Sequence, residues 1–273
     1  MPELPEVEVL RRSLEPELVG RAIESVAVHN RALREPVNAR VLGRRAKGPV
    51  EALRRRAKYL LIDLANGSTL VVHLGMSGRL TLVPGDSARH PHEHVAFGLD
   101  DGRRLRFRDA RRFGLVFALA RSRIAGDRHF RHLGIEPLGG ELSGERLRSL
   151  AGRGRAPVKS FLMDSRRVVG VGNIYACEAL FRAGIHPRRS VARIGRERWD
   201  GLAESVHAVL ERAIAEGGTT LNDFADGSGN AGYFQVSLEV YGREGERCRR
   251  CGGSVRRIVQ SGRSTFYCPG CQR

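Results

Sequence analysis

The sequence predicts an α+β protein in which strands and helices occupy different parts of the chain. Short alternating runs of apolar residues, separated by tight turns, fill the region from residue 21 to about residue 120. Many short strands joined in this way are typical of a β-sandwich or a β-barrel. After about residue 128 the apolar residues take helical spacing, and four cysteines crowd into the last 26 residues. The tail is therefore expected to be a separate metal-bound segment.

A helix is expected over residues 5–19, ahead of the strands. Its apolar residues recur at helical spacing and form one stripe. Pro5 suits a first turn, where its missing N–H is not needed, and Gly20 suits the end. Pro16 is expected to kink or divide the last turn, because proline removes a helical hydrogen bond.

Seven strands are expected after this helix, separated by turn signals such as the "ANG" and "DDG" tripeptides. They cover residues 22–30, 58–64, 68–75, 78–83, 94–100, 103–109 and 113–120. The three arginines that precede Ala57 and Lys58 are interpreted as a solvated charged run in front of a strand.

Four helices are expected in the second half of the chain, over residues 144–152, 157–164, 173–184 and 196–218. Gly217 and Gly218 can end the last of them. The stretch that follows, residues 219–234, is rich in Gly, Asp and Asn and is expected to form a long loop. Long loops inside compact domains are often functional.

The charge balance of the 273 residues is strongly basic. Lys and Arg number 47 against 30 Asp and Glu, which gives a net charge of +17. Such an excess indicates a polyanionic partner, with nucleic acid the first candidate and an anionic membrane the second. A genome rich in arginine codons is the alternative. No apolar stretch approaches the roughly 20 residues of a membrane span, and the first residues are acidic where a signal peptide is basic. A cytoplasmic protein is therefore expected.

The cysteine spacing predicts a structural zinc site. Cys248 and Cys251 form one C-x2-C pair, and Cys268 and Cys271 form a second pair after sixteen residues. Each pair can bind one side of a tetrahedral Zn²⁺, and four thiolates leave no open position. A redox or disulfide pair is the alternative, which a cytosolic chain disfavours. Cys177 lies apart in an apolar helix and is expected in the core.

The metal-bound tail is also basic. Residues 241–273 hold eight arginines and two glutamates, and Arg263 lies between the cysteine pairs. A zinc-stabilised hairpin of this kind can place guanidinium groups against phosphates. A zinc ribbon can instead serve protein contacts, but the charge favours nucleic acid.

Two turns carry apolar residues whose role the local pattern leaves open. Residues 103–109 alternate arginine with apolar residues, so this strand is expected to have one basic face and one apolar face. Arg111 and Phe113 lie in the turn after it, and Met76 lies in another turn between glycines. Local pattern favours burial of Phe113 and Met76. The alternative is insertion into a distorted duplex.

The N-terminus also allows two explanations, one chemical and one structural. Removal of Met1 before the small residue Pro2 would leave a free secondary amine. An α-amino group has a pKa of about 7.7–8.0, so part of it is neutral and able to attack a sugar C1′, giving an iminium. Glu3 could then transfer protons. On local physics alone, acids that favour a helix N-terminus are the simpler explanation.

Eight motifs span the chain from its first residue to its last. They are "MPELPEVE", "RRAKYLL", "HLGMSG", "DARRFG", "VVGVGNIYACEALF", "GGTTLNDF", "VYGREGERC" and the four-cysteine tail. In this order they closely resemble the bacterial formamidopyrimidine-DNA glycosylase family. The resemblance implies a bifunctional repair enzyme of base excision repair, which excises oxidised purines from duplex DNA. A Schiff base at the N-terminal proline would be followed by β- and δ-elimination of the abasic strand.

The resemblance also implies roles for single residues. Pro2 matches the nucleophile and Glu3 the proton donor. Lys58 matches the lysine of β-elimination and phosphate binding, and Arg263 the arginine of phosphate contact and δ-elimination. Three residues match the set that fills the void left by the extruded base, namely Met76, Arg111 and Phe113. Further contacts with DNA or with the lesion are implied for His73, His92, Arg155, Lys159 and Asn173.

The implied architecture has three parts. Residues 1–128 would form a catalytic β-sandwich domain with flanking helices, and residues 129–235 a helix-two-turns-helix domain with a lesion-capping loop at 217–233. Residues 236–273 would form the zinc finger around one structural Zn²⁺. The expected partner is damaged double-stranded DNA, the protein is expected to be a monomer, and no membrane association is expected.

Two positions depart from the family pattern, and two rival functions stay open. Met163 stands where leucine is common, a change that conserves side-chain volume. Family members usually carry proline where this chain has Ala110, which would loosen the turn that directs Arg111 and Phe113. One rival is an endonuclease VIII-like glycosylase for oxidised pyrimidines, disfavoured by the "ELPEVE" motif and the long loop at 217–233. The other is a non-catalytic DNA-binding relative, disfavoured by the intact Pro2, Glu3, Lys58 and Arg263.

Overall fold

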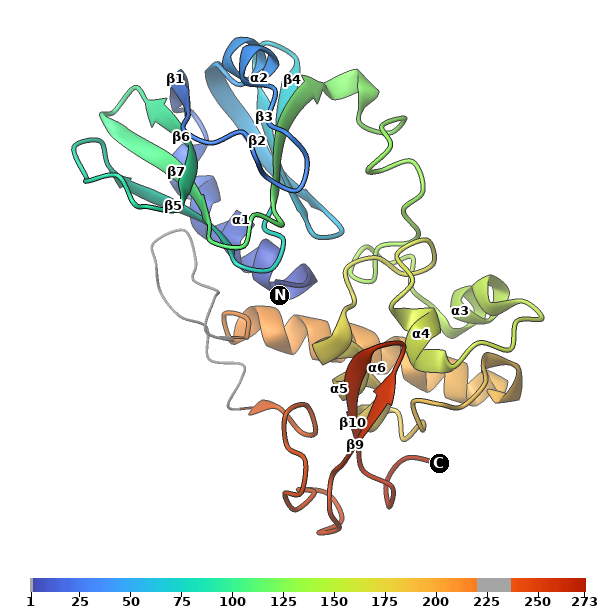
Figure 1. Cartoon of the computed structure of the whole chain (residues 1–273). Helices are drawn as coiled ribbons and strands as arrows, with labels where there is room; N and C mark the ends of the chain where they lie inside the picture. The colour runs from blue at the N-terminus through green and yellow to red at the C-terminus, as the bar shows by residue number, and fades with distance from the viewer. Residues whose placement is uncertain (1, 220–236) are drawn as a thin grey trace. The chain divides into compact units, whose positions relative to one another are not determined.

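The structure is a computed structural model that describes residues 2–219 and 237–273. The chain divides into two compact units, which are described separately. The first holds residues 2–131 and 216–219, and the second holds residues 132–215 and 237–273. Figure 1 shows the strands of the first unit and the helices of the second. The predicted loop at 219–234 lies outside the described residues, except for Thr219.

Helix α1 (Leu4–Leu18) opens the first unit, and its apolar stripe is buried as expected. Pro5 lies in the first turn. The expected break at Pro16 is wrong, because the helix continues to Leu18 and the N–H of Val19 still donates to the carbonyl of Glu15 at 3.0 Å. Proline this close to the end removes only one bond of the helix.

Eight antiparallel strands follow, in the spatial order β5-β7-β6-β1-β2-β3-β4-β8. Their bounds are β1 (Ala22–Val28), β2 (Gly48–Arg56), β3 (Tyr59–Leu64), β4 (Ser68–His73), β5 (Gly78–Pro84), β6 (Glu93–Leu99), β7 (Arg103–Asp109) and β8 (Leu115–Ala120). The seven predicted strands are confirmed, and β8 is followed by a short 3₁₀ turn, η1 (Arg121–Arg123).

The sequence prediction missed β2 and the short helix α2 (Ala39–Arg45). A shift in register between Val50 and Ala52 interrupts the alternation of β2, so its apolar residues lack a clear period of two. The arginines at its end, interpreted as a solvated run, pair with β3 instead. Helix α2 has two turns at most and is capped by the side chain of Asn38.

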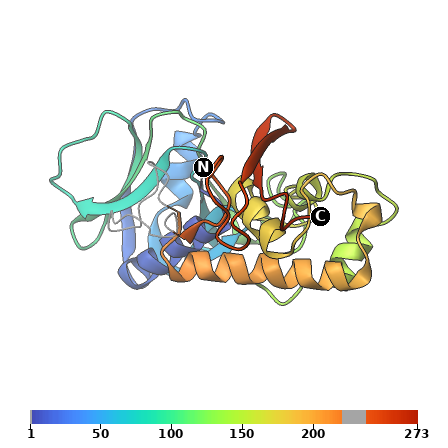
Figure 2. The same cartoon turned by 90° about the horizontal axis from the view of Figure 1, so that it is seen from below.

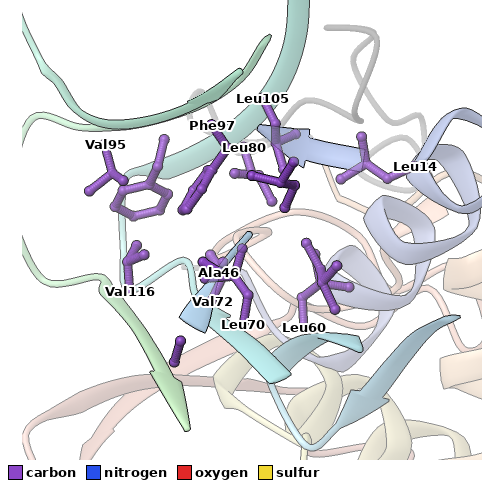
Figure 3. Packing of buried hydrophobic residues seen from close by; sticks show 14 of the residues in the cluster. Leu14, Ala46, Leu60, Leu70, Val72, Leu80, Val95, Phe97, Leu105 and Val116 are labelled. Atoms are coloured by element: carbon purple, nitrogen blue, oxygen red, sulfur yellow. The ribbon is translucent and has the colours of Figure 1, made fainter. Parts of the chain in front are cut away.

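The sheet folds over at β1 and β2, which pair at only two positions, so its two halves face each other. Figure 3 shows side chains of β5, β6 and β7 pointing toward side chains of β3, β4 and β8. This apolar layer is the core of a β-sandwich, as predicted. Its most deeply buried members include Phe97, Phe107, Leu70 and Leu105.

The second unit is helical and confirms the four predicted helices. They are α3 (Gly144–Ala151), α4 (Val158–Leu162), α5 (Asn173–Arg182) and α6 (Arg196–Ala215), with a 3₁₀ turn η2 (Val191–Arg193) before α6. Trp199 of α6 is buried and meets the ring of Phe161 edge-on. Strands β9 (Arg256–Gln260) and β10 (Arg263–Tyr267) form the C-terminal hairpin. Helix α5 lies between α6 and this hairpin (Figure 2).

None of the helices in residues 2–219 and 237–273 is long and apolar enough to cross a membrane. Cys177 is fully buried in α5 and packs against Phe181 and Val240, so its predicted place in the core is confirmed.

Candidate active site and metal centre

The start of α1 is a buried cluster of proline and carboxylates. Pro2 and Glu3 are both buried, and Glu3 is the residue that precedes the first helical turn. The N–H of Glu3 donates to Oε2 of Glu6 at 2.7 Å. The other oxygen of Glu6 accepts hydrogen bonds from the N–H and the hydroxyl of Thr219, both at 2.9 Å. Glu6 therefore joins the first residues of the chain to the segment that follows α6.

Lys58 and His73 lie on neighbouring strands of the sheet. Lys58 belongs to the tight turn between β2 and β3, where Ala57 has a φ of 53°. His73 ends β4, and its Nδ1 accepts a hydrogen bond from the N–H of Gly75 at 3.0 Å. Burial, with the charges of Lys58 and Arg34, lowers the pKa of His73 to about 3. The imidazole is therefore neutral near pH 7, with its proton on Nε2.

Asp109 holds together the two turns that carry Met76 and Arg111. Its carboxylate is fully buried and accepts hydrogen bonds from the hydroxyl of Ser77 at 2.6 Å and from the N–H of Gly114 at 2.7 Å. The N–H of Arg111 adds a third donor at 3.3 Å. Removing this buried acceptor would leave the N–H of Gly114 and the hydroxyl of Ser77 without their bonds to it. Sequence reasoning missed this role of Asp109, because no local signal joins residues so far apart.

The same two turns touch through their backbones. A Cβ on Gly75 would lie 2.4 Å from the carbonyl carbon of Phe113, so only glycine permits this approach. Phe113 is 44% exposed, and the guanidinium of Arg111 lies over its ring, 5.2 Å from the centroid. Met76 is half-buried. The local expectation that Phe113 is a core residue is therefore wrong.

A second cluster lies in the helical unit. Lys159 of α4 is buried, and its ammonium donates to Oδ1 of Asn173 at 2.5 Å and to the hydroxyl of Thr265 at 2.6 Å. Asn173 opens α5, and its amide donates to the carbonyl of Ser264 at 2.9 Å. This network connects two helices to strand β10 of the hairpin.

The remaining predicted site residues lie on the surface of their own units. His92 and Arg111 are exposed in the first unit. Arg155 and Arg263 are exposed in the second, where Arg263 follows two hairpin-turn residues that both have positive φ. Exposed arginine side chains are accessible to phosphates.

The four terminal cysteines form a metal centre. The Sγ atoms of Cys248 and Cys271 are 3.8 Å apart, those of Cys251 and Cys268 are 3.4 Å apart, and all four lie within 4.8 Å of one another. Tetrahedral Zn²⁺ with bonds of about 2.3 Å places its sulfurs about 3.8 Å apart. The residues therefore fit one structural zinc ion, which fastens the turn before β9 to the turn after β10. A Cβ on Gly270 would approach Cys251 Sγ at 3.2 Å, which keeps this turn small.

The fold and these clusters define a basic two-unit protein with a buried N-terminal proline–glutamate pair and a zinc hairpin. Three family models match the chain. The formamidopyrimidine-DNA glycosylase N-terminal domain matches residues 1–116, the H2TH domain of the same glycosylase matches residues 133–225, and the zinc finger found in FPG and IleRS matches residues 245–273.

Individual relatives match over their whole length. A formamidopyrimidine-DNA glycosylase of Halorhodospira halophila is 53% identical over 273 residues, with 100% of both chains covered. The structure of the MutM (FPG) protein of Thermus thermophilus is 38% identical, covers 99% of this chain and 98% of its own, and has a TM-score of 0.89. A Lactococcus lactis FPG mutant bound to Fapy-dG-containing DNA is 30% identical with a TM-score of 0.92, covering 100% of both chains. The chain belongs to the formamidopyrimidine-DNA glycosylase family.

The depressed pKa of His73 predicts a pH-dependent stability. The unfolded state takes up a proton near pH 6.5, whereas the folded state does so only near pH 3. Folding stability is therefore lost as the pH falls below 6.5. Between pH 7.5 and pH 5, the free energy of unfolding of the wild type should fall by about 2 kcal/mol more than that of His73→Gln, as measured by urea unfolding. His207→Gln, at a half-buried position on α6, is the control, and equal pH profiles for wild type and H73Q would contradict the assignment.

Loss of one thiolate is expected to release the zinc ion. Cys268→Ser should lower the metal content from one ion per chain to near zero, because three ligands no longer close the tetrahedron. Amide hydrogens of β9 and β10 should then exchange rapidly with solvent. Cys177→Ala, which changes a cysteine outside the metal centre, should keep the zinc and the slow exchange. Retention of one zinc ion and a protected hairpin in C268S would refute a closed four-thiolate site.

Proposed function

We propose that this protein is a bifunctional DNA glycosylase and abasic-site lyase that removes oxidised purines from duplex DNA in base excision repair. The observation that carries the proposal is the burial of Pro2 and Glu3 together at the start of α1. Membership of the family over the full chain supports it. The similarity to a Lactococcus lactis protein in complex with Fapy-dG-containing DNA supports formamidopyrimidines as substrates, with 8-oxoguanine as the second purine lesion.

In the proposed glycosylase step, the nitrogen of Pro2 is the nucleophile after Met1 has been removed. Its lone pair forms a bond to C1′, while the bond from C1′ to the base breaks and its electron pair leaves with the base, which takes up a proton. The attacking nitrogen loses its own proton, and its lone pair then expels O4′, which is protonated as the sugar ring opens. The product is an iminium between Pro2 and C1′. Glu3 is the group that transfers these protons.

The iminium then accepts electrons for strand cutting. Loss of a proton from C2′ breaks the C3′–O bond and releases the 3′ phosphate, which is β-elimination. A second proton loss breaks the C5′–O bond and releases the 5′ phosphate, which is δ-elimination. Lys58 is proposed to serve the first elimination and Arg263 the second, where their cationic side chains stabilise the departing phosphates.

Extrusion of the damaged base leaves a void that Met76, Arg111 and Phe113 are proposed to fill. Flipping a nucleotide costs a few kcal/mol in lost stacking and pairing. Side chains that occupy the void recover part of this cost, and Arg111 can donate to the orphaned base. The hydrogen bonds of Asp109 support this role, because they hold the two turns in one arrangement.

The remaining contacts are proposed to bind the DNA backbone or the lesion. His92, Arg155 and Asn173 would meet phosphates, and the neutral ring of His73 would donate through Nε2. Asn173 opens α5, where backbone N–H groups favour an anion. Lys159 is proposed to contribute by holding Asn173 and the hairpin in place.

Damaged double-stranded DNA is the proposed partner, and a single copy of the chain is proposed to act on it. The net charge of +17 supports attraction to a polyanion. The proposed cellular site is the cytoplasm, in association with the nucleoid.

Borohydride reduction of the iminium tests both the nucleophile and the substrate. Wild type mixed with an 8-oxoguanine duplex should give a covalent adduct, and peptide mapping should place the DNA on Pro2. Lys58→Ala should still be trapped at Pro2, because the lysine acts after the iminium forms. A thymine glycol duplex should give at least tenfold less adduct at equal times. An adduct on Lys58, no adduct at all, or preferential trapping of the pyrimidine lesion would each contradict the proposal.

A further inference from the structure

The outer face of the sandwich carries a row of arginines on strand β7. Leu105 and Phe107 of this strand are fully buried in the core. Because side chains alternate along a strand, Arg104, Arg106 and Arg108 all lie on the opposite face. The predicted basic face of this strand is thus present, and it is partly buried rather than fully solvated.

A further arginine from the neighbouring strand adds to this row. Arg79 of β5 is the direct cross-strand partner of Arg108. Like charges directly opposite each other destabilise a sheet. Burial, together with the charges of Arg106 and Arg79, lowers the pKa of Arg108. Among the described residues, the buried Nε of Arg108 has no hydrogen-bond partner. The folded protein therefore holds the Arg108 guanidinium partly desolvated and close to two other arginines.

One acid lies within this basic face. Glu93 of β6 is buried and pairs across the strands with Arg108. Its carboxylate lies 3.4 Å from Nε2 of His29 and 3.8 Å from a guanidinium nitrogen of Arg104. Both distances exceed those of a strong charged hydrogen bond. A single carboxylate therefore neutralises only part of the charge of the arginine row.

A pocket of about 190 Å³ opens beside these arginines. It lies at the base of the turn that carries Arg111 and Phe113, and the exposed ring of His92 borders it. The pocket is lined by Ser77, Arg79, His90, His92, Arg108, Asp109 and Ala110. Its two arginines and two histidines surround a space large enough for a phosphate group. Asp109, the one acid in the lining, is already occupied by Ser77 and backbone N–H groups.

We infer that this pocket binds one backbone phosphate of the duplex, held by Arg79 and Arg108, and that Arg104 and Arg106 extend the track along the sheet. A phosphate would add negative charge to that of Glu93, and its oxygens would accept from the partly desolvated guanidinium groups, including the buried Nε of Arg108. The inference rests on the proposed function, since it places a duplex at the 109–114 turn. It adds a contact beyond the residues that match the family motifs.

Salt-dependent binding to a duplex with a tetrahydrofuran abasic analogue tests the inference. Arg108→Gln should weaken binding about tenfold at 0.1 M salt. It should also reduce the slope of log K against log salt by about 0.9, the value for one lost phosphate contact. Arg103→Gln is the matched control on the same strand, because Arg103 is already paired with Glu17 and Asp101. The control should keep the wild-type slope and affinity.

Thermal unfolding of the free protein separates binding from a structural role. If Arg108 is retained for a ligand, R108Q should melt at the wild-type temperature or above, because a repelling charge has been removed. Weaker binding together with a lower melting temperature would mark Arg108 as the structural counter-ion of Glu93 and overturn the inference. Unchanged affinity and slope would overturn it as well.

A scan of single methylphosphonates in the duplex identifies the contact. Neutralising one phosphate near the lesion should weaken wild-type binding and abolish the difference between wild type and R108Q. Failure of every position to do so would exclude a specific phosphate. Borohydride trapping at saturating protein reports the proposed chemistry independently. If wild type is trapped but R108Q keeps the wild-type salt slope, only the phosphate pocket is refuted. If wild type itself is not trapped, the proposed function is refuted.

Discussion

The carboxylate of Glu6 is the contact on which the proposed chemistry depends. The first residues of a chain are usually poorly ordered, so a nucleophile at residue 2 needs an anchor. Glu6 provides one from within α1, since one oxygen accepts from the N–H of Glu3 and the other from Thr219. The acidic start of this basic chain thus has two roles. Glu6 positions the N-terminus, and Glu3, buried beside Pro2, is proposed to transfer protons.

Away from that helix, the first unit places cationic and basic groups close to one another. Arg79 opposes Arg108 across two strands, and burial keeps His73 neutral beside Lys58. Such arrangements lower the stability of the free protein and are expected where a polyanion completes the charge balance. The C-terminal hairpin is stabilised in another way, because its four cysteines fit one zinc ion that adds to the small apolar cluster it shares with α5.

The sequence predicted most of the architecture, and the exceptions have physical causes. Alternating and helical spacings identified seven strands and five helices, and cysteine spacing identified the metal ligands. Strand β2 was missed because its register shift at Val50 removes the alternation. The bond between Ser77 and Asp109 joins residues 32 positions apart and leaves no local signal. Local pattern also misplaced Phe113, and the roles proposed for the site residues came from whole-chain resemblance.

The central claim is that the chemistry needs an unblocked nitrogen on Pro2. The test compares two proportions measured in the same purified sample. Mass analysis of the N-terminal peptide gives the fraction of chains that lack Met1 and carry a free proline, and single-turnover titration with lesion duplex gives the fraction of active molecules. The account predicts that the two fractions agree across preparations with different degrees of processing. An active fraction that clearly exceeds the fraction with free Pro2 would contradict it.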